Sequence, residues 1–497
     1  MLPTRLSRSA QTMLLAPLAV LLALGCHSSS DQGGDTTAIT GTRIDTWHTL
    51  TTGDVARPAD LSAVAIAALV PDGAGGYVTT AGAGKVDGTY RIPTKPAGFY
   101  WLKLGTTYLW TDKEAVAWGM DRIGRPDATP PSSETDLTIT APNLMTWDLY
   151  TDTLLFYNYN TDAYAYDLTN GSLRGAPGMG DTLLNGLTVD WNALYAAPAM
   201  NDSTKGDHPY VIQMGGLDTA QGSVRVAMRV LEPSAYTQAT GLPAATSGTF
   251  AAIPQNRTFR CNVKASEFTP APALVGSRAE INNQWLTLAA LKGAATYGAA
   301  GYSGDLLDAW PTTSTATDFD LGDVAYGNPY PSGWDTLVMG STTYDHTFTL
   351  GAGAPWYLYT SVYLETIQQP TATSPLRPLV GLVKNPTLNG RNLLSDLNAV
   401  GTTPTLAWQA PDLGTPTGYL VRIYRMSLAG ADTTGTLVAE LMARTPTMKV
   451  PPGVLQAGGT YVLMVRSIAQ ATDLTAAPNA YVVPFGAAEL ASGLIQP

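Results

Sequence analysis

The feature that most constrains this chain is its pattern of short apolar–polar alternations, each cut off by glycine or proline. Around the break at 93–98, the runs 90–92 and 100–104 alternate with a period of two residues. That period is typical of half-buried strands, because successive side chains of a strand point to opposite faces. The chain also contains 49 glycines and 35 prolines, which favour frequent turns. The sequence therefore predicts an all-β protein.

The net charge of the chain limits the classes of partner it can bind, and its length indicates how many domains it contains. Acidic residues outnumber basic ones, 39 to 28, and the net charge is −11. Because nucleic-acid binding depends on neutralising phosphates with Lys and Arg, a nucleic-acid partner is not expected. About 470 residues remain after removal of a signal peptide, enough for three or four domains of roughly 100 to 200 residues. We expect a multidomain protein built of β-sandwich modules.

The N-terminus has the layout of an export signal. Arg5 and Arg8 precede an apolar run of about a dozen residues that ends shortly before Cys26. A helix that crosses the hydrocarbon core needs about 20 apolar residues, so the run fits a signal peptide, 1–25, better than a permanent span. The Ser-, Gly- and Asp-rich stretch 26–37 then suits a flexible tether.

The end of this signal, Ala-Leu-Gly-Cys at 23–26, resembles the lipobox of bacterial lipoproteins. The resemblance implies that the Cys26 thiol takes a diacylglyceryl group, that the signal is cut before it, and that the new amino group is acylated. Several palmitate-type chains make a stable membrane anchor. His27, rather than Asp, after the cysteine implies sorting to the outer membrane or cell surface. Ala23 and Leu24 depart from the family's preferred residues, which leaves ordinary cleavage, with Cys26 as a bystander, as the alternative.

The stretch 38–124 is expected to form the first β-sandwich. Its segments 87–92 (DGTYRI) and 96–102 (PAGFYWL) resemble the carboxypeptidase regulatory-like family of transthyretin-type sandwiches. The resemblance implies a hairpin turn at the Asp-Gly pair and a second turn that feeds the next strand. Such modules serve as scaffolds or binding domains, and the family name implies no peptidase activity.

Two Pro-rich linkers, 125–134 and 369–400, are expected to flank a central region, 135–368. Its predicted strands are short and punctuated by turns. They show no fixed repeat period, so a propeller is not predicted. One large β-sandwich, or two, is the favoured architecture, and no family resemblance guides this part.

The C-terminal stretch, 401–497, has two spaced features of a sandwich core. Trp408 lies on a short strand that ends in proline, and Leu455 stands six residues before Tyr461. This pattern resembles a fibronectin type III domain. The resemblance implies that the Trp fills the core between two sheets and that the Tyr hydroxyl bonds the upstream backbone in a tyrosine corner. It indicates a spacer or binding role without indicating a ligand.

Residue types suited to catalysis are sparse. The chain has four histidines, His27, His48, His208 and His346. None of them has a second histidine at metal-ligand spacing. The sequence lacks a Gly-x-Ser-x-Gly elbow and a phosphate-binding Gly-Lys loop. Cys261 is the one thiol besides Cys26, and we expect it to be buried and inert.

One acidic run, Asp318, Asp320 and Asp323, is a candidate metal site. Carboxylates supply the oxygen ligands that Ca²⁺ prefers. The run lacks the glycine and the distal glutamate of an EF-hand loop. A solvated turn before Val324 is therefore the favoured interpretation, with calcium as the alternative cofactor.

Aromatic residues with polar tips are abundant, with 24 Tyr and 11 Trp against 8 Phe. Such rings suit stacking on sugars or capture of peptides. The candidate ligand-binding residues form two clusters in the sequence: Trp147, Tyr157 and Tyr159, then Tyr326, Tyr330 and Trp334. We hypothesise that the first cluster is partly exposed; the alternative is a Tyr-rich sheet face packed in the core.

These observations favour a non-catalytic, lipid-anchored envelope protein whose β modules bind a glycan or protein ligand, or hold the outer face of the envelope. Any ligand is expected to meet the central region, because the small flanking sandwiches leave little room for a pocket. The alternative is a secreted hydrolase of the glycoside hydrolase kind, which needs two carboxylates about 5 to 10 Å apart in a cleft.

Overall fold

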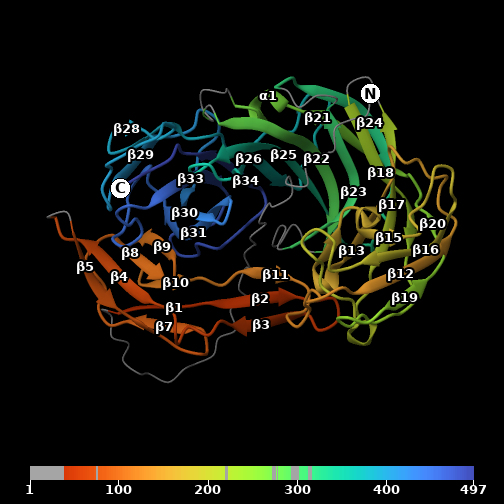
Figure 1. The fold of residues 1–497 in the computed structure, drawn as a ribbon, viewed down its shortest axis with the longest axis horizontal. Helices are drawn as coiled ribbons and strands as arrows, with labels where there is room; N and C mark the ends of the chain where they lie inside the picture. Colours follow the sequence, from red (N-terminus) through yellow and green to blue (C-terminus); the bar gives the residue numbers. More distant parts are fainter. Residues whose placement is uncertain are drawn as a thin grey trace.

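The computed structural model describes residues 38–73, 76–218, 222–270, 276, 278–292, 301–311 and 316–497. Strands dominate this part of the chain, as Figure 1 shows. Helix within it is limited to α1 (Ala265–Phe268) and the 3-10 turns η1 (Tyr159–Thr161), η2 (Leu168–Gly171) and η3 (Ser203–Lys205). The predicted all-β, multidomain sandwich class is confirmed. None of the helices in these ranges is both long and apolar enough to cross a bilayer.

The N-terminal unit is a sandwich of two four-stranded layers. Its strands are β1 (Ile39–Thr42), β4 (Ile66–Pro71), β5 (Tyr77–Ala81), β6 (Ala83–Gly84), β7 (Thr89–Ile92), β8 (Tyr100–Leu104), β9 (Thr107–Thr111) and β10 (Ala115–Ala117). One layer has the order β10-β1-β7-β6 and the other β5-β4-β8-β9. The alternation read from the sequence places Tyr90 and Ile92 of one layer against Tyr100 and Leu102 of the other in a shared core.

A three-stranded connector joins this sandwich to the central region. It consists of β2 (Ile44–His48), β3 (Asp54–Pro58) and β11 (Asp121–Ile123), in the order β11-β2-β3. His48 is buried here, and its ring nitrogens lie 2.7 Å from Asp54 Oδ1 and 2.9 Å from Asp121 Oδ1. Burial alone would lower the pKa of His48, but these two carboxylates raise it above its ordinary value. In Figure 1 the connector runs along the bottom, between the N-terminal sandwich and the central strands.

The first half of the central region is a second sandwich. Its strands are β12 (Asp136–Pro142), β13 (Thr153–Asn158), β14 (Ala163–Ala165), β15 (Ser172–Arg174), β16 (Leu183–Asp190), β17 (Tyr210–Asp218), β18 (Gly222–Leu231), β19 (Ala244–Ser247) and β20 (Ala251–Ala252). The sheet β15-β16-β12-β19 packs on β13, β14 and β17 through a separate buried cluster. Phe156 and Trp191 meet edge to face in it, 4.8 Å between ring centroids.

The second half of the central region has longer strands. They are β21 (Arg257–Val263), β22 (Ala279–Leu291), β23 (Gly304–Pro311), β24 (Phe319–Tyr326), β25 (Asp335–Phe348) and β26 (Trp356–Thr366). The sheet continues from β18 through β23, β22 and β25 to β26. The β21–β24 pair and α1 contribute Phe259, Cys261 and Phe268 to the same core, so Cys261 is buried as expected. Burial raises the pKa of its thiol to about 12, which keeps the sulfur protonated and unreactive.

The C-terminal sandwich begins earlier than the sequence indicated. Its strands are β27 (Lys384–Leu388), β28 (Arg391–Asn392), β29 (Thr405–Gln409), β30 (Gly418–Ala429), β31 (Asp432–Ala443), β32 (Thr447–Lys449), β33 (Thr460–Ala469) and β34 (Phe485–Ala491). The expected linker 369–400 is wrong in its second half, because β27 pairs with β29 and completes the sheet β28-β27-β29-β32. Trp408 is buried, and the Tyr461 hydroxyl accepts from the Gln456 amide at 2.9 Å, the contact that the Leu–Tyr spacing predicts.

The other expected linker, 125–134, is also anchored. Arg125 is buried and forms two hydrogen bonds of 3.0 Å with the Asp207 carboxylate. A paired, bidentate arginine of this kind fixes the chain where it enters the central region. The connections between the units are therefore parts of the folded body rather than free spacers.

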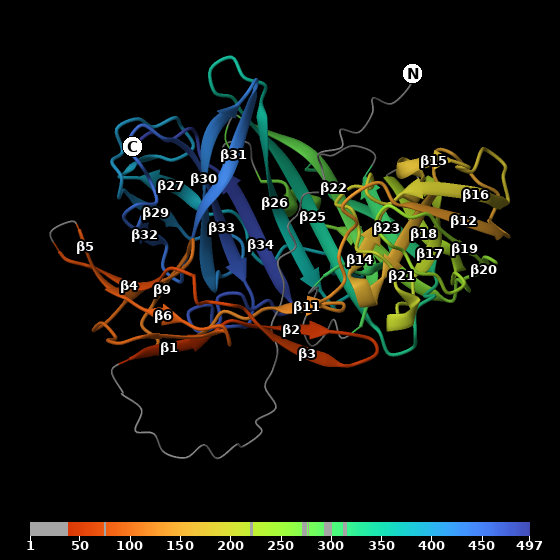
Figure 2. The same ribbon diagram turned by 60° about the horizontal axis from the view of Figure 1, so that its bottom comes forward.

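One ladder of hydrogen-bonded strands runs through all three units. The 17-stranded sheet passes from β26 to β34, then through β33 and β30 to β31, and from β31 to β9 of the N-terminal sandwich. Figure 2 shows the C-terminal strands β30, β33 and β34 beside the long central strands β25 and β26. Both edges of the four-stranded C-terminal layer are thus occupied by strands of other units.

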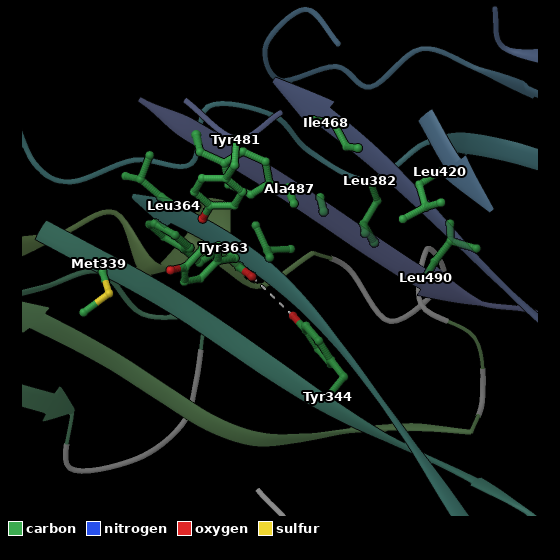
Figure 3. Close-up of a cluster of buried hydrophobic side chains, with 14 of the residues drawn as sticks. Met339, Tyr344, Tyr363, Leu364, Leu382, Leu420, Ile468, Tyr481, Ala487 and Leu490 are labelled. Atoms are coloured by element: carbon green, nitrogen blue, oxygen red, sulfur yellow. Dashed lines mark hydrogen bonds between the residues drawn. The ribbon is translucent and has the colours of Figure 1, made fainter. Parts of the chain in front are cut away.

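Side chains pack continuously across the junction between the central and C-terminal units. Figure 3 shows Tyr363 and Leu364 of β26 close to Ala487 of β34, with Tyr344 of β25 and Leu490 of β34 in the same view. All of these belong to one buried cluster. The junction therefore resembles the interior of a domain more than a contact between mobile domains.

Candidate functional site

The first aromatic cluster is buried, so the hypothesis of an exposed patch is wrong. Trp147, Tyr157 and Tyr159 are exposed by only 3%, 0% and 1%. The strands do place Tyr157 in a common sheet with its neighbours, but the loop that contains Trp334 covers that face. Trp147 packs in a different core, that of the first central sandwich. These rings are therefore core residues.

The two clusters that the sequence suggested do meet, but inside the protein. Tyr330 and Trp334 stack with ring planes 1° apart, and Tyr157 meets the edge of each ring. Tyr159 also lies against Trp334, with ring centroids 5.4 Å apart. Tyr326, another of the six candidate residues, is buried at the end of β24. Of these residues only Trp334 is half-buried, so the arrangement ties a loop to the sheet and offers little surface for a ligand.

The contacts of Asp318, Asp320 and Asp323 argue against the calcium hypothesis, because all three carboxylates form ion pairs with basic side chains. Asp318 pairs with Lys264, and Asp320 and Asp323 both pair with Arg260. These basic side chains occupy the carboxylates that a cation would need. Within the described part of the chain, no three His, Cys, Asp or Glu side chains are arranged to hold a metal ion.

Two buried aspartates, Asp305 and Asp308, lie close together along β23 in the central region. A register shift between β22 and β23 separates the two residues, so the usual alternation does not hold between them. Tyr164 donates to Asp305 at 2.7 Å, and Thr287 donates to Asp308 at 2.5 Å. Burial raises the pKa of both carboxyls, that of Asp308 to about 6, and the charge of Asp308 raises that of Asp305 further. Sequence reasoning missed this pair, because residues three apart on a regular strand face opposite ways.

A pocket lies where the N-terminal and C-terminal sandwiches meet. Its volume is about 200 Å³, and it is lined by Lys103, Gly105, Thr106, Tyr108, Arg425, Val438, Gly453, Val454, Gln456 and Tyr461. A wider hollow of about 650 Å³ adjoins it and shares Arg425 and Val438. Apart from Leu350, its lining comes from the C-terminal sandwich. The sequence predicts that any ligand meets the central region, because each flanking sandwich leaves little room for an enclosed pocket; these two hollows are open and lie at the junction and on the C-terminal sandwich instead.

The proposed lipid anchor lies outside the residues that the structure describes. Cys26 and the tether 26–37 are not among the described residues, so their prediction stands on the sequence alone. The first described strand, β1, begins directly after that stretch, at Ile39.

Comparison with known protein families and with characterised proteins found no match to this chain.

Proposed function

We propose that this chain is an exported, lipid-anchored envelope protein that acts without catalysis, as a rigid scaffold or binding protein. The anchor is inferred from the signal and Cys26. The observation that supports a scaffold is the unbroken ladder through β26–β34 and β31–β9. A protein whose units share sheets resists bending between them, which suits a load-bearing or presenting role at a surface. The resemblances to carboxypeptidase regulatory-like and fibronectin type III modules agree with such a role.

The hydrolase alternative requires two carboxylates in a cleft. Asp305 and Asp308 come nearest to that requirement, but they are only 5% and 7% exposed. Each accepts a hydrogen bond from a neighbouring hydroxyl, and neither of the two hollows reaches them. A structural role explains this pair without a substrate, so we favour the scaffold.

The anchor is tested by replacing Cys26 with serine. Because the thiol is the acylation point, Cys26→Ser should abolish incorporation of labelled palmitate and move the protein out of the membrane fraction. Cys261→Ser is the matched control, since it removes the other, buried thiol and should leave both labelling and location unchanged. A Cys26→Ser protein that is processed normally and stays fully in the membrane fraction contradicts the proposal.

A further inference from the structure

Lys103 and Arg425 are brought together by the fold from positions far apart in the sequence. Lys103 is on β8, and Arg425 is on β30, yet both line the 200 Å³ pocket. Neither cation forms an ion pair with an acidic side chain of the described residues, although pairs of that kind hold many basic residues elsewhere in this acidic protein. No acidic side chain is among the described residues that line the pocket. The pocket is therefore a local positive site in a chain of net charge −11.

The strands determine how each cation reaches the pocket. Tyr419, Val421 and Ile423 are buried on one face of β30, and Arg425 is the next residue on that face, in the second half of the strand. Its Nη1 donates to Gln456 Oε1 at 3.0 Å, and that contact orients the guanidinium within the pocket, which Gln456 also lines. A fixed guanidinium is well suited to bind a planar or tetrahedral anion.

Lys103 reaches the pocket from the opposite side. Tyr100, Leu102 and Leu104 of β8 face the N-terminal core, so Lys103 faces outward, toward the C-terminal sandwich. Its Nζ lies 5.4 Å from the centroid of the Tyr108 ring. A cation held over an aromatic face keeps its charge and gains a defined position. The parallel pairing of β31 with β9 holds the two sandwiches, and so the two cations, in register.

The rest of the lining indicates what surrounds the anion. Thr106 and Gln456 provide polar groups beside the cations, and Ser427, Thr436 and Thr460 line the adjoining hollow. Hydroxyl and amide groups of this kind bind sugar hydroxyls. The small pocket holds about one compact group, because it is smaller than the roughly 300 Å³ of a typical small-molecule site. The adjoining hollow offers room for the part of the ligand that follows.

We infer that the junction of the N-terminal and C-terminal sandwiches binds an acidic sugar residue of a glycan, whose carboxylate or phosphate lies between Lys103 and Arg425. This inference deepens the proposed binding role and does not depend on the lipid anchor. A failure to bind acidic sugars would therefore leave the Cys26 results untouched, and a failure of the Cys26 experiment would leave the binding results untouched.

The test uses the full-length protein in detergent and titration calorimetry with three probes: D-glucuronate, D-glucose 6-phosphate and uncharged D-glucose. We expect at least one anionic probe to bind, with an affinity that falls as salt is added, and glucose not to bind. Binding of glucuronate alone identifies a carboxylate source, and binding of the phosphate ester alone identifies a phosphate source. Absence of binding by both anions, or equal binding of glucose, overturns the inference.

The double variant Lys103→Met/Arg425→Met should weaken binding of the anionic probe at least tenfold. Arg57→Met/Lys85→Met is the matched control, because it also removes two positive charges, but from exposed positions outside the pocket, and it should bind like the wild type. Lys103→Arg keeps the charge and should retain binding, which separates loss of charge from loss of folding. Equal losses in the two double variants, or unchanged binding in the pocket variant, would overturn the inference.

Discussion

Asp305 and Asp308 occupy buried positions in which a charged carboxylate is costly. Oδ2 of Asp308 has no hydrogen-bond partner among the described residues. Burial removes hydration from a charge at that atom, and this outweighs the stabilising effects of the Thr287 hydroxyl and of Arg225, so folding raises the pKa of Asp308. The pair thus makes the central region sensitive to pH without any need for a catalytic role.

The sign of this pH dependence follows from the raised pKa of Asp308. Because folding raises that pKa from 3.8 to about 6, its contribution to stability is fully present below about pH 4 and is lost as the pH rises through about 6. The loss is on the order of 3 kcal/mol at pH 8. Asp308→Asn should therefore raise the melting temperature at pH 8 and change it little at pH 4, as measured by scanning calorimetry. Asp112→Asn, at an exposed position, is the control; an equal shift at both pH values for Asp308→Asn would refute the assignment.

Trp408 is a large side chain in the core of the C-terminal sandwich. Its ring meets Tyr419 at 5.1 Å between centroids and is buried. Trp408→Ala should cost about 3 to 5 kcal/mol of unfolding free energy, measured by denaturant titration, because it removes the ring and leaves a cavity. Tyr150→Ala is the control, since that ring is 82% exposed and its loss should cost little. A cost below about 1 kcal/mol for Trp408→Ala would show that the core lies elsewhere.

Sequence reasoning succeeded at this scale where a residue's neighbours are close along the chain. The resemblance of the stretch around Leu455 and Tyr461 to a fibronectin type III domain implied a bond between the Tyr461 hydroxyl and the backbone just upstream, and the Gln456 amide donates that bond. Alternation alone could not show that Tyr157 is buried, because it defines a shared face and not what covers that face. The covering ring, Trp334, lies far away in the sequence, so its placement required the tertiary fold.

Among the elements, β34 carries the junction between the central and C-terminal units. It pairs with β26 on one side and β33 on the other. Gly486 is buried within it, opposite Leu364, and a Cβ at Gly486 would lie 2.7 Å from the Leu379 Cβ. The absence of a side chain at this position lets the segment that contains Leu379 pack directly on the strand.

Gly486→Ala should therefore destabilise the protein. Overpacking of this kind typically costs about 1 to 3 kcal/mol, so the melting temperature should fall. Gly178→Ala is the matched control, because the nearest atom to its added Cβ is 3.4 Å away, an ordinary contact with an aspartate side chain. If both variants melt at the wild-type temperature, the junction tolerates the methyl group and the close approach at Gly486 has no energetic importance.

The pairing of β34 with β26 and of β31 with β9 could not be predicted from the sequence. Local alternation identifies strands, but it contains no information on which strand edges meet across more than a hundred residues. The same limit applies to the pocket, since Lys103 and Arg425 each look like a solvated surface charge when read alone. The linker 369–400 was misjudged because its Pro-rich composition hid the short strand β27.

For the molecule as a whole, the strands shared between units imply that the three units unfold together. If the three units were independent, each would unfold at its own temperature. Because β34 and β31 connect them through backbone hydrogen bonds and a continuous core, we expect one dominant calorimetric transition for the full-length chain. Three resolved transitions, each matching the enthalpy of a unit of that size, would show that the junctions are weak.

The same arrangement affects how the chain is made. Synthesis delivers the N-terminal residues first, so the edges of β9 and β26 form before β31 and β34 arrive to occupy them. Until then each edge presents unpaired backbone groups that can recruit a strand from another molecule. A chain that stops short of β31 would leave both edges permanently open. The C-terminal strands β31 and β34 therefore cover the exposed edges of β9 and β26. Because they are made last, a newly synthesised chain is prone to aggregate until they have paired.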